Sequence, residues 1–143
     1  MTMKLFKSIF LALTVLILVS CEKENESGDI IENTYTGKVN VTSGGNDPAG
    51  DFTGSGDSGT YSFAWNNPQS RASLNFDITT TTGSCQFILL DADGTEVLNK
   101  TRSAGGNDSY SGVSSAGTKG LWTVTMILTD FNGDGSYSLH PGD

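Results

Sequence analysis

The chain has 143 residues, of which 16 are acidic and 8 are basic, so its formal net charge at pH 7 is −8. This balance excludes a nucleic-acid partner, because a phosphate-binding surface needs clustered lysine and arginine, and the basic residues of this sequence are scattered. Without its N-terminal segment, the chain is long enough for one folded domain.

The N-terminal segment has the layout of a bacterial export signal. Lys4 and Lys7 precede an apolar run over residues 9–19, and acidic residues begin directly after Cys21. The run is shorter than the about 20 apolar residues that a membrane-spanning helix needs. Its ending, Leu-Val-Ser-Cys, resembles the lipobox of bacterial lipoproteins, which implies cleavage before Cys21 and lipidation of this residue. An ordinary signal peptide is the alternative, but the Ala-x-Ala pattern typical of its cleavage site is missing.

Residues 22–29 are polar and mostly charged, which predicts a solvated tether. A lysine and several acids behind a lipidated cysteine resemble the signal that sends Bacteroidetes-type lipoproteins to the outer face of the outer membrane. The resemblance implies an outer-membrane protein that is held by acyl chains (palmitate among them) on Cys21 and faces the cell exterior. A periplasm-facing anchor, or charges that only keep a linker soluble, are the alternatives. We therefore predict a signal peptide over residues 1–20, a lipidated cysteine and tether over 21–33, and a folded domain over 34–143.

The composition of the folded part predicts short strands joined by tight turns. This part is rich in glycine, serine, threonine, asparagine and aspartate, and almost none of its segments has apolar residues at helical spacing. A glycine-rich loop is expected over residues 42–58, either mobile or shaped around something. The expected strands are residues 35–41, 61–65, 72–79, 85–90, 95–101, 110–114, 121–129 and 136–139. About eight strands at this spacing favour an all-β fold, a single antiparallel β-sandwich of jelly-roll type.

Aromatic residues stand on one side of two expected strands. Tyr61, Phe63 and Trp65 alternate with small residues, and Trp122 begins a similar apolar alternation. Such spacing is typical of a core. The alternative is that Trp65 and Trp122 form a ligand-binding platform, because flat rings suit the apolar faces of sugars.

Two features lie in the middle of the chain. Cys85 starts an apolar alternation and has no neighbouring base, so we expect a small buried hydrophobic residue rather than a reactive thiol. The segment from Asp91 to Gly94 is predicted to form a tight hairpin turn. Glycine allows a positive φ, and the aspartate side chain can form hydrogen bonds with the backbone.

The segment 130–135 carries two alternatives. Asp130, Asn132 and Asp134 have the alternate oxygen spacing of a calcium loop, and Gly135 permits a sharp bend. The bidentate glutamate of an EF-hand is missing, because Pro141 stands at its position. The same residue types form hairpin turns, so the segment is expected either to turn the strand 121–129 back into 136–139 or to bind Ca²⁺ as a possible cofactor. Asp91 and Asp93 are a weaker second place for the ion.

Three stretches together resemble the bacterial pre-peptidase C-terminal domain. They are Phe-Ile-Leu-Leu-Asp-Ala-Asp-Gly ending at Gly94, Gly-Leu-Trp-Thr-Val ending at Val124, and Gly-Asp-Gly-Ser-Tyr-Ser-Leu ending at Leu139. The resemblance covers residues 58–140. It implies a non-catalytic β-sandwich that assists binding or display, with no catalytic residues.

Catalysis is not indicated by the remaining residues. His140 is the sole histidine and lies near the end of the chain, and no pair of carboxylates stands out. We therefore expect a non-enzymatic envelope lipoprotein that displays a β-sandwich for binding a partner, such as another envelope protein. The alternative is a carbohydrate-binding module, with or without calcium, whose partner is a glycan.

Overall fold

The computed structural model describes residues 25–42, 46–105 and 108–142. Within these ranges the chain forms seven strands and no helix. The three long strands are β3 (Ala49–Asn67), β4 (Arg71–Leu90) and β7 (Gly120–Gly142). The four short ones are β1 (Ile30–Asn33), β2 (Lys38–Val39), β5 (Glu96–Ser103) and β6 (Ser109–Val113).

Backbone hydrogen bonds join all seven strands into one antiparallel sheet with the order β1-β3-β7-β4-β5. β2 adds to β3 and β6 adds to β4. The pairing of the three long strands is interrupted near their middles, between Ser55 and Gly59 on β3 and between Thr80 and Ser84 on β4. Because such irregularities bend a strand and increase its twist, the sheet can fold over along this line.

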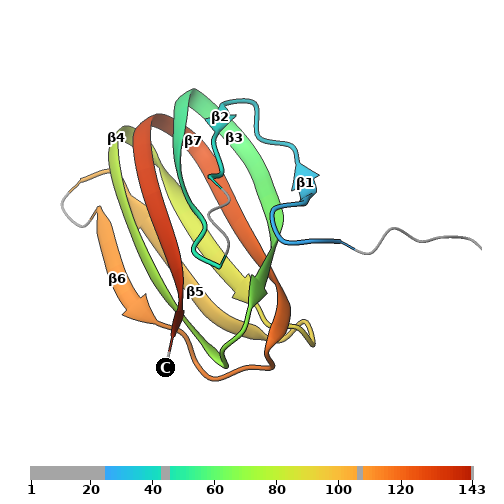
Figure 1. The fold of residues 1–143 in the computed structure, drawn as a ribbon. Coiled ribbons are helices and arrows are strands. Elements are labelled where there is room, and N and C mark those ends of the chain that lie inside the picture. The colour runs from blue at the N-terminus through green and yellow to red at the C-terminus, as the bar shows by residue number, and fades with distance from the viewer. Residues whose placement is uncertain (1–24, 43–45, 106–107, 143) are drawn as a thin grey trace, which may run out of the picture.

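Ring contacts show that the sheet does fold over into two layers. Phe63 pairs with Val124 on β7, and Tyr137 lies thirteen residues farther along the same strand, which is about 40 Å in a straight strand. The ring centroids of Phe63 and Tyr137 are nevertheless only 6.2 Å apart. In Figure 1 the three long strands arch over at the top of the view from one layer into the other.

Each long strand therefore contributes to both layers of a β-sandwich. Layer A contains residues 49–55 of β3, 71–80 of β4 and 132–142 of β7, with β2 and β6 at its edges. Layer B contains residues 59–67, 84–90 and 120–129 of the same strands, with β1 and β5 at its edges.

The bend is built from residues that tolerate an irregular backbone. Gly83 has a φ of 85°, and a Cβ there would lie 2.5 Å from the carbonyl carbon of Asp130. Asp130 has a φ of 45°, a conformation that aspartate adopts more readily than most residues. Threonine hydroxyls then satisfy the carbonyls that the irregular ladder leaves free, as Thr82 donates to Asp130 O over 3.0 Å.

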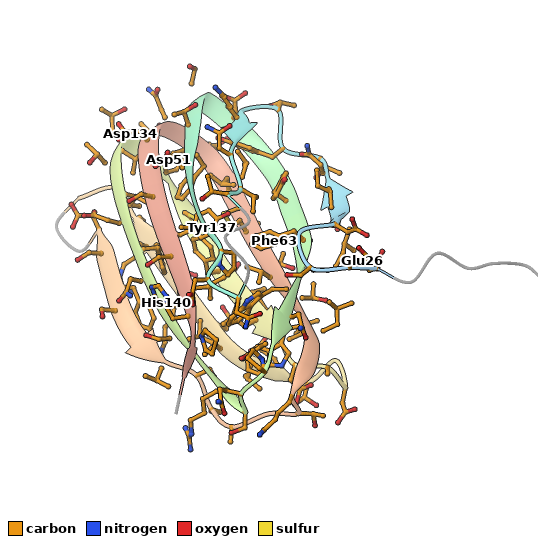
Figure 2. The ribbon with its side chains drawn as sticks, in the orientation of Figure 1. Glu26, Asp51, Phe63, Asp134, Tyr137 and His140 are labelled. Carbon is orange, nitrogen blue, oxygen red and sulfur yellow. The ribbon has the colours of Figure 1, made fainter. Side chains whose placement is uncertain are left out.

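The core lies between the layers and is rich in aromatic rings. Phe87 of layer B is fully buried, and its ring lies within 6.3 Å of three rings of layer A, those of Phe52, Phe76 and Tyr137. Figure 2 shows Phe63 and Tyr137 between the layers. The burial of these rings from both sides is the main force that holds the sandwich closed.

The predicted all-β antiparallel sandwich is confirmed. The hairpin at Asp91 and Gly94 is also confirmed, since it joins β4 to β5 and Gly94 has a φ of 80°. Cys85 is buried with 0% exposure, as expected for a small core residue.

Several element boundaries were wrong. Residues 121–129 and 136–139 are parts of the single strand β7, so the predicted hairpin at 130–135 is a bulged bend. Residues 72–79 and 85–90 likewise belong to β4, and most of the predicted loop 42–58 belongs to β3. The physical reason is that glycine, asparagine and aspartate suit a bend inside a strand as well as a turn.

The predicted tether is shorter than expected. Residues 30–33 pair with β3 as strand β1, and Ala64 N donates to Asp29 O over 2.8 Å. Among the described residues, none forms a helix long and apolar enough to cross a membrane. The predicted signal peptide and Cys21 lie outside the described residues.

Candidate ligand-binding face

The outer surface of layer A is polar because side chains alternate along its strands. On β7, Phe131, Tyr137 and Leu139 point into the core and are at most 4% exposed. The residues between them face outward and are exposed or half-buried; they are Asn132, Asp134, Ser136 and Ser138. β3 and β4 add further outward polar residues, which are Asp51, Asn75, Asp77 and Thr79.

Strand register brings three carboxylates of this surface together. Asp51 of β3 and Asp77 of β4 both pair with Ser136 of β7. Asp134 precedes Ser136 by two residues and faces the same side. Adjacent strands lie about 4.8 Å apart, so the three carboxylates surround Ser136. Figure 2 shows Asp51 and Asp134 close to each other near the bend.

The surface is hollowed at this place. One hollow of about 310 Å³ is lined by Asp51, Asp77, Thr79, Asp134, Gly135 and Ser136. A second, of about 240 Å³, lies toward β6, and its lining includes Asn75, Asp77, Ser109, Tyr110, Ser136 and Ser138. Asp77 and Ser136 line both hollows, so the two hollows are neighbours on this face, and we call them together the layer A groove.

The lining of the layer A groove selects the charge of a ligand. Carboxylates, hydroxyls and one amide line it together with the aromatic residues Phe76, Tyr110 and Tyr137, and none of its described lining residues is basic. Carboxylates only accept hydrogen bonds, while hydroxyls and the amide of Asn75 both donate and accept. The groove therefore suits an uncharged ligand with many hydroxyl groups and disfavours an anion.

The two tryptophans predicted as a binding platform lie in the core instead. Trp65 and Trp122 pair across β3 and β7, and both are 0% exposed. Their rings meet edge to face with centroids 5.8 Å apart. The indole N–H groups donate to Asn46 O over 2.8 Å and to Thr118 O over 2.7 Å. Stacking on a sugar needs an exposed ring face, which neither residue offers.

The residues predicted to bind calcium are spread along β7. Asp130 lies in the bend, where its Oδ1 accepts a hydrogen bond from Ser58 over 3.3 Å. Asn132 and Asp134 follow on the outer face of layer A in extended backbone rather than in a loop that converges on a point. The described residues contain no group of three or more His, Cys, Asp or Glu that could hold a metal ion. Calcium binding here stays a prediction, which melting in calcium against EDTA tests.

Asp91, the weaker calcium candidate, holds a turn. Its carboxylate accepts hydrogen bonds from the backbone N–H groups of Asp93, Thr95 and Thr118 over 2.8–3.0 Å. These donors, led by that of Thr118, lower the pKa of the Asp91 carboxyl. Asp91 therefore fixes the β4–β5 hairpin to the segment before β7.

The sole histidine has a nearby carboxylate. The Nδ1 atom of His140 lies 3.1 Å from Oδ1 of Asp47, and both side chains are about half exposed, at 52% and 55%. This exposure gives the pair none of the burial that tunes catalytic groups. Exposed polar contacts of this kind contribute little to stability.

Sequence reasoning missed most of the layer A groove. Residues 72–79 were expected to form a strand, and because side chains alternate along a strand, Asn75 and Asp77 share one of its faces. Asp51, however, fell in the predicted loop 42–58, Asp134 fell inside the predicted turn 130–135, and Ser136 began the next expected strand. Only strand register brings these residues together.

Comparison with known proteins gives matches at the level of structure alone. No family model matches the chain, and no curated protein matches it. Among solved structures, the chain is similar to an arabinose-bound GH51 α-L-arabinofuranosidase, with 16% identity and a TM-score of 0.42 over 80% of this chain. It spans only 23% of that protein.

Two smaller proteins also show similarity in structure. One is TmCBM61 in complex with beta-1,4-galactotriose, with 14% identity and a TM-score of 0.46 over 76% of this chain and 87% of that one. The other is the carbohydrate-binding module CBM6cm-2 from Cellvibrio mixtus lichenase 5A in complex with cellotriose. It shows 11% identity and a TM-score of 0.41 over 82% of this chain and 100% of that one.

Proposed function

We propose that this protein is a non-catalytic β-sandwich that binds a neutral glycan in the layer A groove. The observation that carries the proposal is the pair of neighbouring hollows that share Ser136, whose lining includes three carboxylates, hydroxyls and an amide. Three rigid strands hold these groups, so little conformational freedom is lost when a ligand binds.

Sugar hydroxyls match the groove in both hydrogen-bonding roles. Each hydroxyl donates one proton and accepts others, so it can donate to Asp51, Asp77 or Asp134 and accept from Asn75 or Thr79. Hydrogen bonds to charged groups are worth about 1.5–3 kcal/mol each. An acidic sugar would instead meet three carboxylates at close range, which disfavours its binding.

A protein partner has less support. Four large apolar side chains of the described residues are exposed, and they lie on separate strands or at an edge; they are Ile30, Ile31, Val113 and Leu121. Protein interfaces need a contiguous patch with a buried centre. The layer A groove is therefore a better candidate binding site than these scattered apolar residues.

We include the predicted anchor in the proposal. Acyl chains on Cys21 would hold the domain at the outer membrane, facing the cell exterior. The tether between Cys21 and the first backbone contact of the sandwich, at Gly28, would span at most about 25 Å when extended. A domain held in this way would capture glycans close to the membrane. Mass spectrometry of the natural protein, with a diacyl or triacyl group on Cys21 as the expected result, tests the anchor separately.

The groove is tested by filling it. Ser136→Trp puts a large ring between Asp51 and Asp77, at the point that the two hollows share. Thr101→Trp puts the same ring on the outward side of β5 in layer B, and is the matched control. Binding is measured by calorimetry with the neutral oligosaccharides that the purified protein selects from a glycan array.

We expect the wild type and Thr101→Trp to bind the same neutral glycan, and Ser136→Trp to bind it at least tenfold more weakly. The melting temperatures of both variants are measured as the control for correct folding. If no neutral glycan binds the wild type, or if Ser136→Trp binds as well as the control, the proposal is wrong.

A further inference from the structure

A third hollow of about 380 Å³ lies at the open edge of the sandwich, between β5 of layer B and β6 of layer A, and Tyr110 lines both this hollow and the second hollow of the layer A groove. In Figure 1 these two edge strands lie on the same side of the molecule, one behind the other. We call this hollow the edge groove. Its lining includes Glu96, Leu98, Asn99, Lys100, Tyr110 and Ser115.

Two basic side chains point from β5 toward Tyr110. Lys100 pairs with Phe87 and Arg102 pairs with Cys85, and both of these partners face the core. Directly paired residues face the same side of a sheet, so Lys100 and Arg102 project from the inner side of layer B. Lys100 Nζ lies 5.7 Å from the centroid of the Tyr110 ring, and Arg102 Cζ lies 5.3 Å from it.

The Tyr110 ring is held in place. Its centroid lies 5.8 Å from that of Phe76. It also lies across the backbone of Gly112, because a Cβ at that position would come within 2.8 Å of Tyr110 Cζ. A fixed ring beneath two cations keeps their charges at one place.

The Arg102 guanidinium is fixed as well. Its Nε donates to Ser109 O over 2.6 Å, and its Nη1 donates to Thr101 O over 2.9 Å. The first of these bonds ties β5 to β6 beside the edge groove, whose lining includes neither Arg102 nor Ser109. The remaining N–H groups of the planar fork stay available to a carboxylate.

Positive charge is concentrated here in an acidic chain. The described residues contain five lysines and arginines, and two of them are on this ring. Among those residues, neither Lys100 nor Arg102 lies within ion-pair distance of a carboxylate. An ammonium beside a guanidinium that is held by hydrogen bonds is an arrangement that favours an anion.

We propose that the edge groove binds the carboxylate of an acidic sugar. The carboxylate would lie between Lys100, which lines the hollow, and Arg102, which adjoins it at the Tyr110 ring. The sugar hydroxyls would meet the polar groups of Asn99, Ser115 and Glu96, whose carboxylate also lines the hollow and accepts a hydrogen bond from Asn99 Nδ2 over 3.4 Å. Lys100 and Arg102 do not line the layer A groove, whose carboxylates disfavour such a ligand, although Tyr110 lines both places. The chain would then distinguish neutral from acidic sugars at two separate places.

The probe is trigalacturonate, compared with the neutral trisaccharide of galactose, in calorimetric titrations of the purified protein. We expect trigalacturonate to bind and its affinity to fall as salt is raised, because ions screen exposed charges. Lys100→Gln with Arg102→Gln should weaken binding at least tenfold. The matched control is Lys38→Gln with Lys119→Gln, which removes the same charge from exposed positions elsewhere and should bind like the wild type.

Lys100→Gln alone covers the case in which the loss of Arg102 weakens the fold, because Lys100 is exposed. It should weaken binding by at least threefold with an unchanged melting temperature. Ser136→Trp should leave the binding of trigalacturonate unchanged, which separates this site from the layer A groove. The proposal is overturned if trigalacturonate does not bind, if the control pair loses as much affinity as the test pair, or if a triglutamate peptide binds instead.

Discussion

Replacing Phe87 by alanine tests whether the two layers pack as described. The ring is fully buried, and it contacts Phe76, Tyr137 and Phe52 of the opposite layer at centroid distances of 4.7, 5.5 and 6.3 Å. Truncation of a buried phenylalanine costs about 3–5 kcal/mol. Because each aromatic pair adds about 0.5–1.5 kcal/mol and three pairs are lost, we expect the upper part of that range. A single domain has a total stability of only about 5–15 kcal/mol.

Urea unfolding followed by tryptophan fluorescence measures this loss, because Trp65 and Trp122 are buried in the folded state. Thr101→Ala on the exposed side of β5 is the control and should change stability by no more than about 0.5 kcal/mol. The slope of free energy against urea should stay the same if the unfolded states are alike. A loss below about 1.5 kcal/mol for Phe87→Ala would refute the packing of one layer against the other.

Three further predictions concern single groups. Gly135→Ala should destabilise the fold by about 1–3 kcal/mol in the same urea assay, because the new Cβ would come within 2.6 Å of Phe52 Cε2; an unchanged midpoint would contradict this. The Cys85 thiol should react with Ellman's reagent only after unfolding, since burial raises its pKa, and fast labelling of the folded protein would be the opposing result. Burial raises the pKa of Tyr35 to about 12 and also raises that of Tyr137. The stability that these groups contribute is therefore full below the ordinary tyrosine pKa of about 10 and is lost as pH rises through 12. Absorbance at 295 nm should show the two titrating together with alkaline unfolding, rather than near pH 10 in a folded protein.

The alternation of apolar and polar side chains in the sequence was enough to predict much of the fold. Along the expected strand 72–79, the alternate apolar residues Leu74, Phe76 and Ile78 are buried, at no more than 3% exposure. Trp122 and the alternate apolar residues after it are buried in the same way. Alternation is a local signal, so it survives whatever the strands pair with.

Glycine misled the prediction of where strands end. Gly50 and Gly54 lie inside β3, where they were assigned to a loop. A Cβ on Gly50 would come within 3.0 Å of Tyr137 Oη and within 2.9 Å of Asn40 C. These glycines therefore allow other groups to approach the strand closely, and a single sequence does not distinguish that role from a turn.

The candidate site could not be derived from the sequence, because it depends on pairing over long distances. Asp51 and Asp77 are 26 residues apart, and they become neighbours only because Ser136 pairs with both. The same holds for the edge groove, where Tyr110 meets Lys100 and Arg102 across two layers. The scattered basic residues of the sequence are thus partly gathered by the fold.

The most direct test of the account is a map of backbone amide shifts on adding the neutral glycan that the protein selects. If the glycan binds in the layer A groove, the shift changes concentrate at Asp51, Asn75, Asp77, Asp134 and Ser136. The amide shifts on the outer face of layer B then stay unchanged. Shifts centred on layer B or on the turn at Asp91, with none around Ser136, would contradict it.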